Sequence, residues 1–207
     1  MRSEEQLKNL PYFNKSTLEE VLEKSGENLN YWVKKLLAKE ELVSLKKGLY
    51  VSKLYLLGLE KNPALREAYL EYLANIIRYP SYLSLEYALA KYGLIPEAVY
   101  NFTCVTLKSS RTYQNDLGNF IYRKIKESLF NGFVATSFED KKIRIASPAK
   151  ALFDWLYFRR GSSLEGLRIN WDAFLKNDRE EFSKFVALAN SRKMTSIFKY
   201  LEKRREF

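Results

Sequence analysis

The sequence contains no histidine and only one cysteine, and these two absences exclude several classes of site. Without histidine there is no histidine-based catalytic triad, no histidine-ligated metal and no histidine pH switch. Cys104 cannot form a disulfide within one chain, and no second cysteine is present to build a cysteine-ligated zinc site. We therefore expect no bound metal. The cysteine usage favours a cytoplasmic protein.

Long apolar runs and phosphate-binding loops are also missing. No run is long enough to span a membrane, and the segment MRSEEQLKNL lacks the apolar region of a signal peptide. We find no glycine-rich phosphate loop and no cluster of acidic metal ligands, so we expect no cofactor and no enzymatic activity. One spacing, Ser147-Pro-Ala-Lys150, matches that of some acyl enzymes. A Ser-Pro step at the start of a helix explains it better, because the other motifs of those enzymes are absent.

Apolar residues and positive charge are abundant. Of the 207 residues, 46% are hydrophobic and 15% are aromatic, which is enough for one large or two small well-packed domains. The net charge of +10 makes a polyanion the first partner to consider. The alternative is that the lysines only keep the protein soluble.

Residues 28–53 combine an amphipathic helix with a basic hairpin. Apolar residues recur at intervals of three and four, as in a helix with one buried face. They are Leu29, Trp32, Val33, Leu36 and Leu37. The other face carries Asn28, Asn30, Tyr31, Lys34, Lys35 and Lys39. Alternating apolar residues around a Lys46-Lys47-Gly48 turn then predict a β-hairpin. They are Val43, Leu45, Leu49 and Val51.

A shorter helix precedes this segment. We expect Ser16 to cap a helix from Thr17 to Lys24, followed by a Ser25-Gly26 turn. Helix, turn, helix and basic hairpin, in this order, make up a winged helix-turn-helix, whose second helix lies in the major groove of DNA. The sequence thus predicts a DNA-binding domain over residues 1–53.

The candidate DNA-binding residues are Asn28, Asn30, Tyr31, Lys34, Lys35, Lys46 and Lys47. Asparagine can bond adenine edges and lysine can reach guanine or phosphate. The alternative is a solvated helix face and ordinary turn chemistry. Residues 1–53 contain ten basic and eight acidic residues and so carry only +2 of the net charge. If DNA is the partner, we expect the rest of the chain to share the backbone contacts.

Residues 54–207 predict a second domain of mixed structure. Residues 54–62 indicate a connector with an apolar docking surface, and Asn62 then caps a helix that begins at Pro63. Helices are also expected near 84–92, near 149–158 and in two segments beyond. Strand candidates are 99–107, 119–126, 130–137 and 141–145, with a turn at 115–118. The predicted fold is α+β, with a small, mainly antiparallel sheet and flanking helices.

Four segments carry a recognisable pattern. They are a Ser-Leu-Glu helix leading to Tyr-Gly-Leu-Ile-Pro, a strand ending Val-Thr-Leu-Lys-Ser-Ser-Arg-Thr, a Leu-Gly-Asn-Phe-Ile-Tyr-Arg segment and an Ala-Ser-Pro-Ala-Lys-Ala-Leu-Phe-Asp helix. Together they resemble the AbiEi family of antitoxins, most strongly over 81–158 and only weakly beyond. That family pairs an N-terminal winged helix-turn-helix with a C-terminal antitoxin domain, here residues 54–207.

The resemblance implies a DNA-binding antitoxin that represses its own operon and neutralises an AbiEii-like nucleotidyltransferase toxin. It leaves open whether toxin and antitoxin touch, and whether the protein associates cooperatively with itself on DNA. Many relatives carry arginine-rich recognition helices, whereas this sequence uses lysine, a point charge and not a bidentate fork, so their base contacts cannot be copied over. In the best-matching stretch, Arg111, Arg123 and Lys124 are the candidates for the antitoxin surface. Asp154, in an apolar helix, needs a partner if it is buried, and an arginine is the expected one. The alternative to the antitoxin role is that Arg111 or Arg123 is scaffold and pairs with Asp154 inside the fold.

Three alternatives stay open. One is a stand-alone winged-helix transcription factor whose second domain binds an effector or dimerises. Another is an enzyme acting on nucleic acid, which would need an acidic metal site that the sequence does not show. The third is a protein-interaction module with a vestigial winged helix, which salt-sensitive and sequence-selective DNA binding would exclude.

Overall fold

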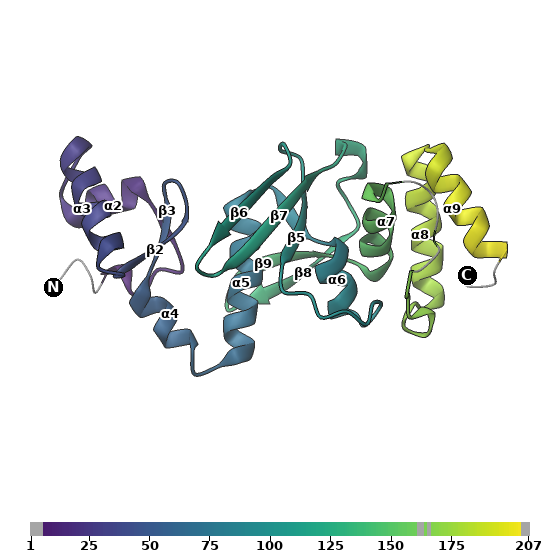
Figure 1. Ribbon diagram of the computed structural model, residues 1–207, viewed down its shortest axis with the longest axis horizontal. Helices are drawn as coiled ribbons and strands as arrows, with labels where there is room; N and C mark the ends of the chain where they lie inside the picture. The colour runs from purple at the N-terminus through teal and green to yellow at the C-terminus, as the bar shows by residue number, and fades with distance from the viewer. Residues whose placement is uncertain (1–5, 161–163, 165–166, 204–207) are drawn as a thin grey trace. The chain divides into compact units, whose positions relative to one another are not determined.

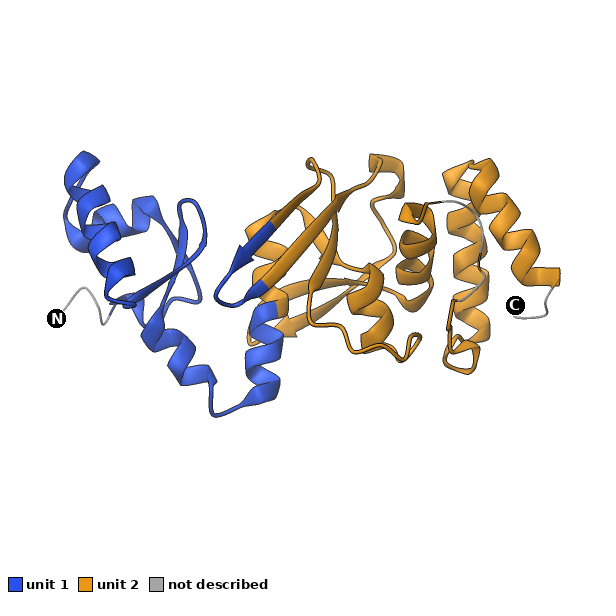
Figure 2. Cartoon of the chain, viewed as in Figure 1, with its two compact units in different colours: residues 1–70, 113–118 blue, residues 71–112, 119–207 orange. Residues whose placement is uncertain are grey.

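The computed structural model describes residues 6–160, 164 and 167–203, and these residues form an α+β fold. They contain a three-stranded antiparallel sheet and a six-stranded mixed sheet (Figure 1). The chain divides into two compact units (Figure 2). Unit 1 consists of residues 1–70 and 113–118, and unit 2 of residues 71–112 and 119–207. The division of roles at residue 53 stays a prediction.

Unit 1 begins with a pair of helices. β1 (Phe13–Asn14) leads into α2 (Lys15–Leu22), and α3 (Gly26–Ala38) follows after a short turn. The expected cap at Ser16 is wrong, because the Asn14 side chain accepts the backbone N–H of Thr17 at 2.9 Å. Asn14 has extended backbone geometry directly before the helix, so its side chain reaches the free N–H groups of the first turn.

An antiparallel hairpin follows α3. β2 (Leu42–Lys46) pairs with β3 (Leu49–Ser52), and β1 pairs with the other side of β3. Gly48 closes the hairpin turn at φ +79°, a backbone conformation that favours glycine. The expected alternation is confirmed, since all four of its apolar residues are buried. They are Val43, Leu45, Leu49 and Val51.

The apolar core of unit 1 lies mainly under the two helices. Leu18 of α2 and Leu29 of α3 are fully buried. The stripe predicted on α3 is confirmed at Leu29, Val33 and Leu36, which are buried. Trp32 is only half-buried, so it belongs to the border between the core face and the solvent face of α3.

The stretch expected to be a connector is helical. α4 (Lys53–Leu59) begins after Ser52, whose hydroxyl accepts the N–H of Tyr55 at 3.0 Å and caps the helix. α5 (Pro63–Ile77) follows, and Asn62 caps it as expected by accepting the N–H of Leu65 at 3.1 Å. An apolar stretch with a serine before it satisfies the requirements of a capped helix as well as those of a connector.

The larger sheet has the strand order β6-β7-β5-β4-β9-β8. Its strands are β4 (Ser81–Leu83), β5 (Phe102–Thr106), β6 (Arg111–Asn115), β7 (Gly118–Lys124), β8 (Phe133–Phe138) and β9 (Lys141–Ala146). β4–β5 and β8–β9 are antiparallel, whereas β5–β7 and β4–β9 are parallel. The larger sheet is therefore mixed, and its two parallel pairings were not predicted from the sequence. β6 takes the outer edge of the sheet, which lets β7 return beside β5 in the same direction.

Helices complete unit 2. They are α6 (Leu85–Lys91), α7 (Pro148–Phe158), α8 (Lys176–Ala189) and α9 (Arg192–Lys203), beside part of α5. α7 packs against α6 and α8, and α9 packs against α8 (Figure 1). The Ser147 hydroxyl accepts the N–H of Lys150 at 3.2 Å, and Pro148 stands in the first turn. The Ser-x-x-Lys spacing is thus a helix start, as expected.

A buried ion pair lies in α7. Lys150 Nζ is 2.7 Å from Asp154 Oδ1, and both side chains are fully buried. The expected arginine partner is wrong, because Arg111 and Arg123 are exposed while Lys150 stands four residues away on the same helix. The contact is electrostatic rather than a well-aligned hydrogen bond.

The second oxygen of Asp154 is bound by two hydroxyls. The Tyr82 hydroxyl donates to Oδ2 at 2.9 Å and the Ser84 hydroxyl at 2.8 Å. Burial raises the pKa of Asp154 and lowers that of Lys150, and each partner opposes the shift in the other. Burial and Asp154 together raise the pKa of Tyr82, so this hydroxyl stays a donor. The cluster is a structural tie between α7 and the segment around β4.

We predict that Asp154→Asn lowers the free energy of unfolding by about 3–5 kcal/mol, because it removes the nearest counter-charge of the buried Lys150. Asparagine keeps an acceptor for Tyr82 and Ser84. The double variant Lys150→Met, Asp154→Asn should recover most of the loss, since removing both charges is often close to neutral. Urea unfolding of the three proteins is the measurement. Equal destabilisation of the single and double variants would show that the charge pair is not the cause.

Candidate nucleic-acid interface

The solvent face of α3 is polar and carries the residues predicted to bind DNA. Asn28, Asn30, Tyr31 and Lys34 are exposed, while the opposite side of α3 is buried. Tyr31 exposes 62% of its surface. Gly26, at φ +57°, allows the sharp turn that separates α3 from α2. The helix thus presents two amides, a phenol and an ammonium together.

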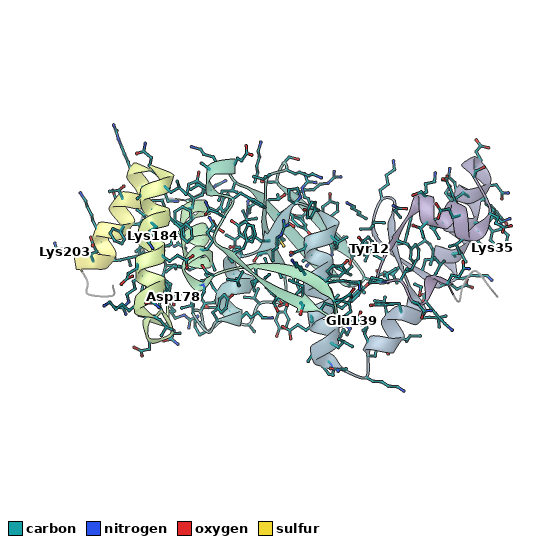
Figure 3. The ribbon with its side chains drawn as sticks, turned by 180° about the vertical axis from the view of Figure 1, so that it is seen from behind. Tyr12, Lys35, Glu139, Asp178, Lys184 and Lys203 are labelled. Carbon is teal, nitrogen blue, oxygen red and sulfur yellow. The ribbon has the colours of Figure 1, made fainter. Side chains whose placement is uncertain are left out.

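Trp32 divides the lysines of this region into two kinds. The ammonium of Lys35 lies 4.6 Å from the centre of the Trp32 ring, and that of Lys24 lies 5.2 Å from it. Lys35 is half-buried as a result, whereas Lys34 points to solvent. Figure 3 shows Lys35 at the outer side of α3. Cation–π contact holds the Lys35 charge beside the ring, whereas the exposed Lys34 charge is solvated.

The hairpin supplies a second basic element. Lys47 is exposed at the tip of the turn, and Lys46 is half-buried. The amide of Asn115 donates to the carbonyl of Leu45 at 2.9 Å, so residues 113–118 support the free edge of β2 within unit 1. Among the residues that the structure describes, no acidic side chain forms a salt bridge with Lys34 or Lys47, whereas Lys39 pairs with Glu41 at 3.6 Å. Uncompensated positive charge therefore remains on both α3 and the hairpin tip.

The three residues proposed for the antitoxin surface are all exposed. Arg111 lies on the edge strand β6, and Arg123 and Lys124 end β7. Arg123 also lines a pocket of about 550 Å³, together with Glu86, Trp155 and other residues. Sequence reasoning missed this pocket. The only signal for it was the i, i+4 spacing of Trp155 and Arg159 at the end of α7.

Other basic residues of the sheet are engaged locally. Lys141 contacts Asp140 at 2.5 Å and Glu139 at 3.8 Å. The Arg144 guanidinium lies 5.3 Å from the ring centre of Tyr79 and 5.5 Å from that of Phe133. These side chains are therefore less available to a polyanion than their number in the sequence indicates.

Comparisons with known proteins add no identification: no model of a protein family matches this chain, and no curated protein matches it. In the described residues, no helix is both long and apolar enough to cross a membrane.

The contact with Trp32 predicts unequal effects of two neighbouring substitutions. Lys35→Ala should lower the free energy of unfolding by about 0.5–1 kcal/mol, because it removes the ammonium from the ring. Lys34→Ala should change it by less than about 0.5 kcal/mol, as expected for a solvated surface residue. Chemical denaturation of both variants checks this. An equal effect of the two changes would mean that the lysine–tryptophan contact contributes nothing.

Proposed function

We propose that residues 1–53 act as a winged helix-turn-helix that binds operator DNA, with α3 in the major groove. One observation carries the proposal: α3 buries Leu29, Val33 and Leu36 and presents polar and basic residues opposite them. This is the arrangement that a recognition helix requires, because one face must hold the fold while the other reads base edges. The exposed lysine at the hairpin tip supports the same proposal.

In this proposal each candidate residue contacts a particular part of the DNA. The amides of Asn28 and Asn30 bond base edges, and adenine suits them best. The Tyr31 hydroxyl and the Lys34 ammonium contact phosphates, and Lys35 adds charge from its position beside Trp32. Lys46 and Lys47 contact the backbone beside the groove. Bound in this way, the protein would occlude its own promoter and act as a repressor.

We further propose that the chain is the antitoxin of a toxin–antitoxin pair, with a nucleotidyltransferase-like toxin as partner. Support comes from the resemblance over 81–158 and from the exposed cations Arg111, Arg123 and Lys124. The competing proposal is a stand-alone transcription factor with an effector-binding second domain. The pocket beside Arg123 favours that proposal, and a neighbouring gene for such a toxin would favour the antitoxin.

The DNA-binding proposal predicts that one variant loses affinity for all DNA and that another loses sequence discrimination. Lys34→Ala should weaken binding to all sequences and lower the log–log salt slope by about one, because one phosphate contact is lost. Asn30→Ala should reduce discrimination between the upstream DNA of its own gene and random DNA by about 1–3 kcal/mol. Fluorescence anisotropy at several salt concentrations measures both.

Lys61→Ala is the matched control, since Lys61 is an exposed lysine of unit 1 outside α3 and the hairpin. It should leave affinity and salt slope unchanged. If Lys61→Ala and Lys34→Ala act alike, binding is unspecific charge attraction and α3 has no special role.

Neutralisation of the toxin should survive the loss of DNA binding. Point variants of the full chain are the appropriate test, because α5 contributes residues to both units and a truncation would disturb both. Cells that express the toxin with the Asn30→Ala, Lys34→Ala double variant should grow as well as those with the unaltered chain. Growth arrest with a soluble, folded variant would contradict the separation of the two roles.

A further inference from the structure

The pocket of unit 2 is formed where four segments converge. Glu86 comes from the first turn of α6, Arg123 from the end of β7, and Trp155 from α7. The stretch that leads into β5 supplies Tyr100 and Asn101. Its volume of about 550 Å³ lies within the range of small-molecule sites, about 300–1,000 Å³.

Two guanidiniums line this pocket, those of Arg123 and Arg159, and neither forms a salt bridge with Glu86, the carboxylate of the same lining. Within the described part of the chain, no acidic group forms a salt bridge with Arg123 or Arg159. Arg159 also has a cation for a neighbour, since burial and then the charge of Arg159 lower the pKa of Lys193. Unpaired arginines at a concave surface attract an anion, and their planar fork fits phosphate and carboxylate alike.

The other polar groups of the pocket use part of their hydrogen-bonding capacity within the protein. Trp155 Nε1 donates to Glu86 Oε1 at 3.0 Å, which fixes the indole and leaves the second oxygen of Glu86 as an acceptor. Asn101 Oδ1 accepts from Asn119 at 3.0 Å, so the amide N–H groups of Asn101 remain as donors. The pocket therefore offers cations, one acceptor, one donor and aromatic surface.

We propose that this pocket binds a nucleoside phosphate. The two arginines hold the phosphate, the Trp155 and Tyr100 rings provide a flat surface for the base, and Glu86 accepts from a sugar hydroxyl or a base amino group. Inorganic phosphate would leave the aromatic surface unused. An aromatic carboxylate would supply one negative charge for two arginines and no donor for Glu86. A nucleoside phosphate meets all of these groups.

Calorimetric titration of the full chain with AMP, CMP, GMP and UMP, and with inorganic phosphate, tests the proposal. At least one nucleotide should bind with Kd below about 1 mM and more tightly than phosphate. Arg123→Gln and Arg159→Gln should each weaken binding by about tenfold or more, the usual effect of losing a charged hydrogen bond. Arg160→Gln is the control, because Arg160 is exposed next to Arg159 but does not line the pocket.

The titration contains no DNA and no toxin, so it can fail or succeed without a failure of the DNA-binding proposal. The proposal is overturned if no nucleotide binds below about 1 mM. It is overturned equally if the two pocket variants, shown by circular dichroism to be folded, bind as the control does. A 5′-phosphorylated RNA trinucleotide is titrated as well. If the trinucleotide binds more tightly than the mononucleotide and depends on the same two arginines, the ligand is the 5′ end of an RNA. If the mononucleotide binds more tightly, the ligand is a free nucleotide.

Tryptophan fluorescence gives a second readout. The chain has three tryptophans, and the binding nucleotide should change the emission of the unaltered protein. Trp155→Phe should abolish that change, and Trp171→Phe should retain it, because Trp171 lies outside the pocket. Persistence of the change in Trp155→Phe would show that the base does not lie on Trp155.

Discussion

The Lys150–Asp154 pair is the interaction on which the arrangement of unit 2 depends. A charged pair out of water has little tolerance for displacement, because an oxygen or proton left without a partner costs free energy. Asp154 is held by Lys150 on one side and by Tyr82 and Ser84 on the other, so α7 cannot rotate about its axis without breaking these contacts. Trp155 is the next residue, and it is thereby kept facing Glu86.

In unit 1 the constraint is different, because α3 must pack against the core on one face and expose polar residues to solvent on the other. The apolar side of α3 fixes its position, and its polar side is then free of structural duties except at Trp32. This separation explains why changes at Lys34 and Lys35 need not be equivalent, although the two residues are identical and adjacent. Charge that is held in place is already desolvated in part, whereas charge on a flexible stem must be ordered when a ligand binds.

Local patterns in the sequence predicted much of the fold. The period of α3, the alternation of the hairpin and the Ser147 cap depend on neighbours along the chain, and all three are present. The predictions failed where two residues compete for one role, or where the residues involved lie far apart in the sequence. Asn14 and Ser16 are both good caps, and only the end of β1 decides between them. β6 is too polar to be recognised as a strand, and the pocket unites residues that are far apart in the sequence.

The hydrogen bond from Asn115 to the carbonyl of Leu45 affects when unit 1 can complete its folding during synthesis. Unit 1 is discontinuous, because residues 113–118 belong to it although residues 71–112 do not. A ribosome adds about 5–20 residues per second, so this intervening stretch takes roughly 2–8 seconds to make. During that interval the hairpin edge must rely on water for its missing partner. Unit 1 is therefore the first to start folding on the ribosome but is completed only after part of unit 2 has been translated.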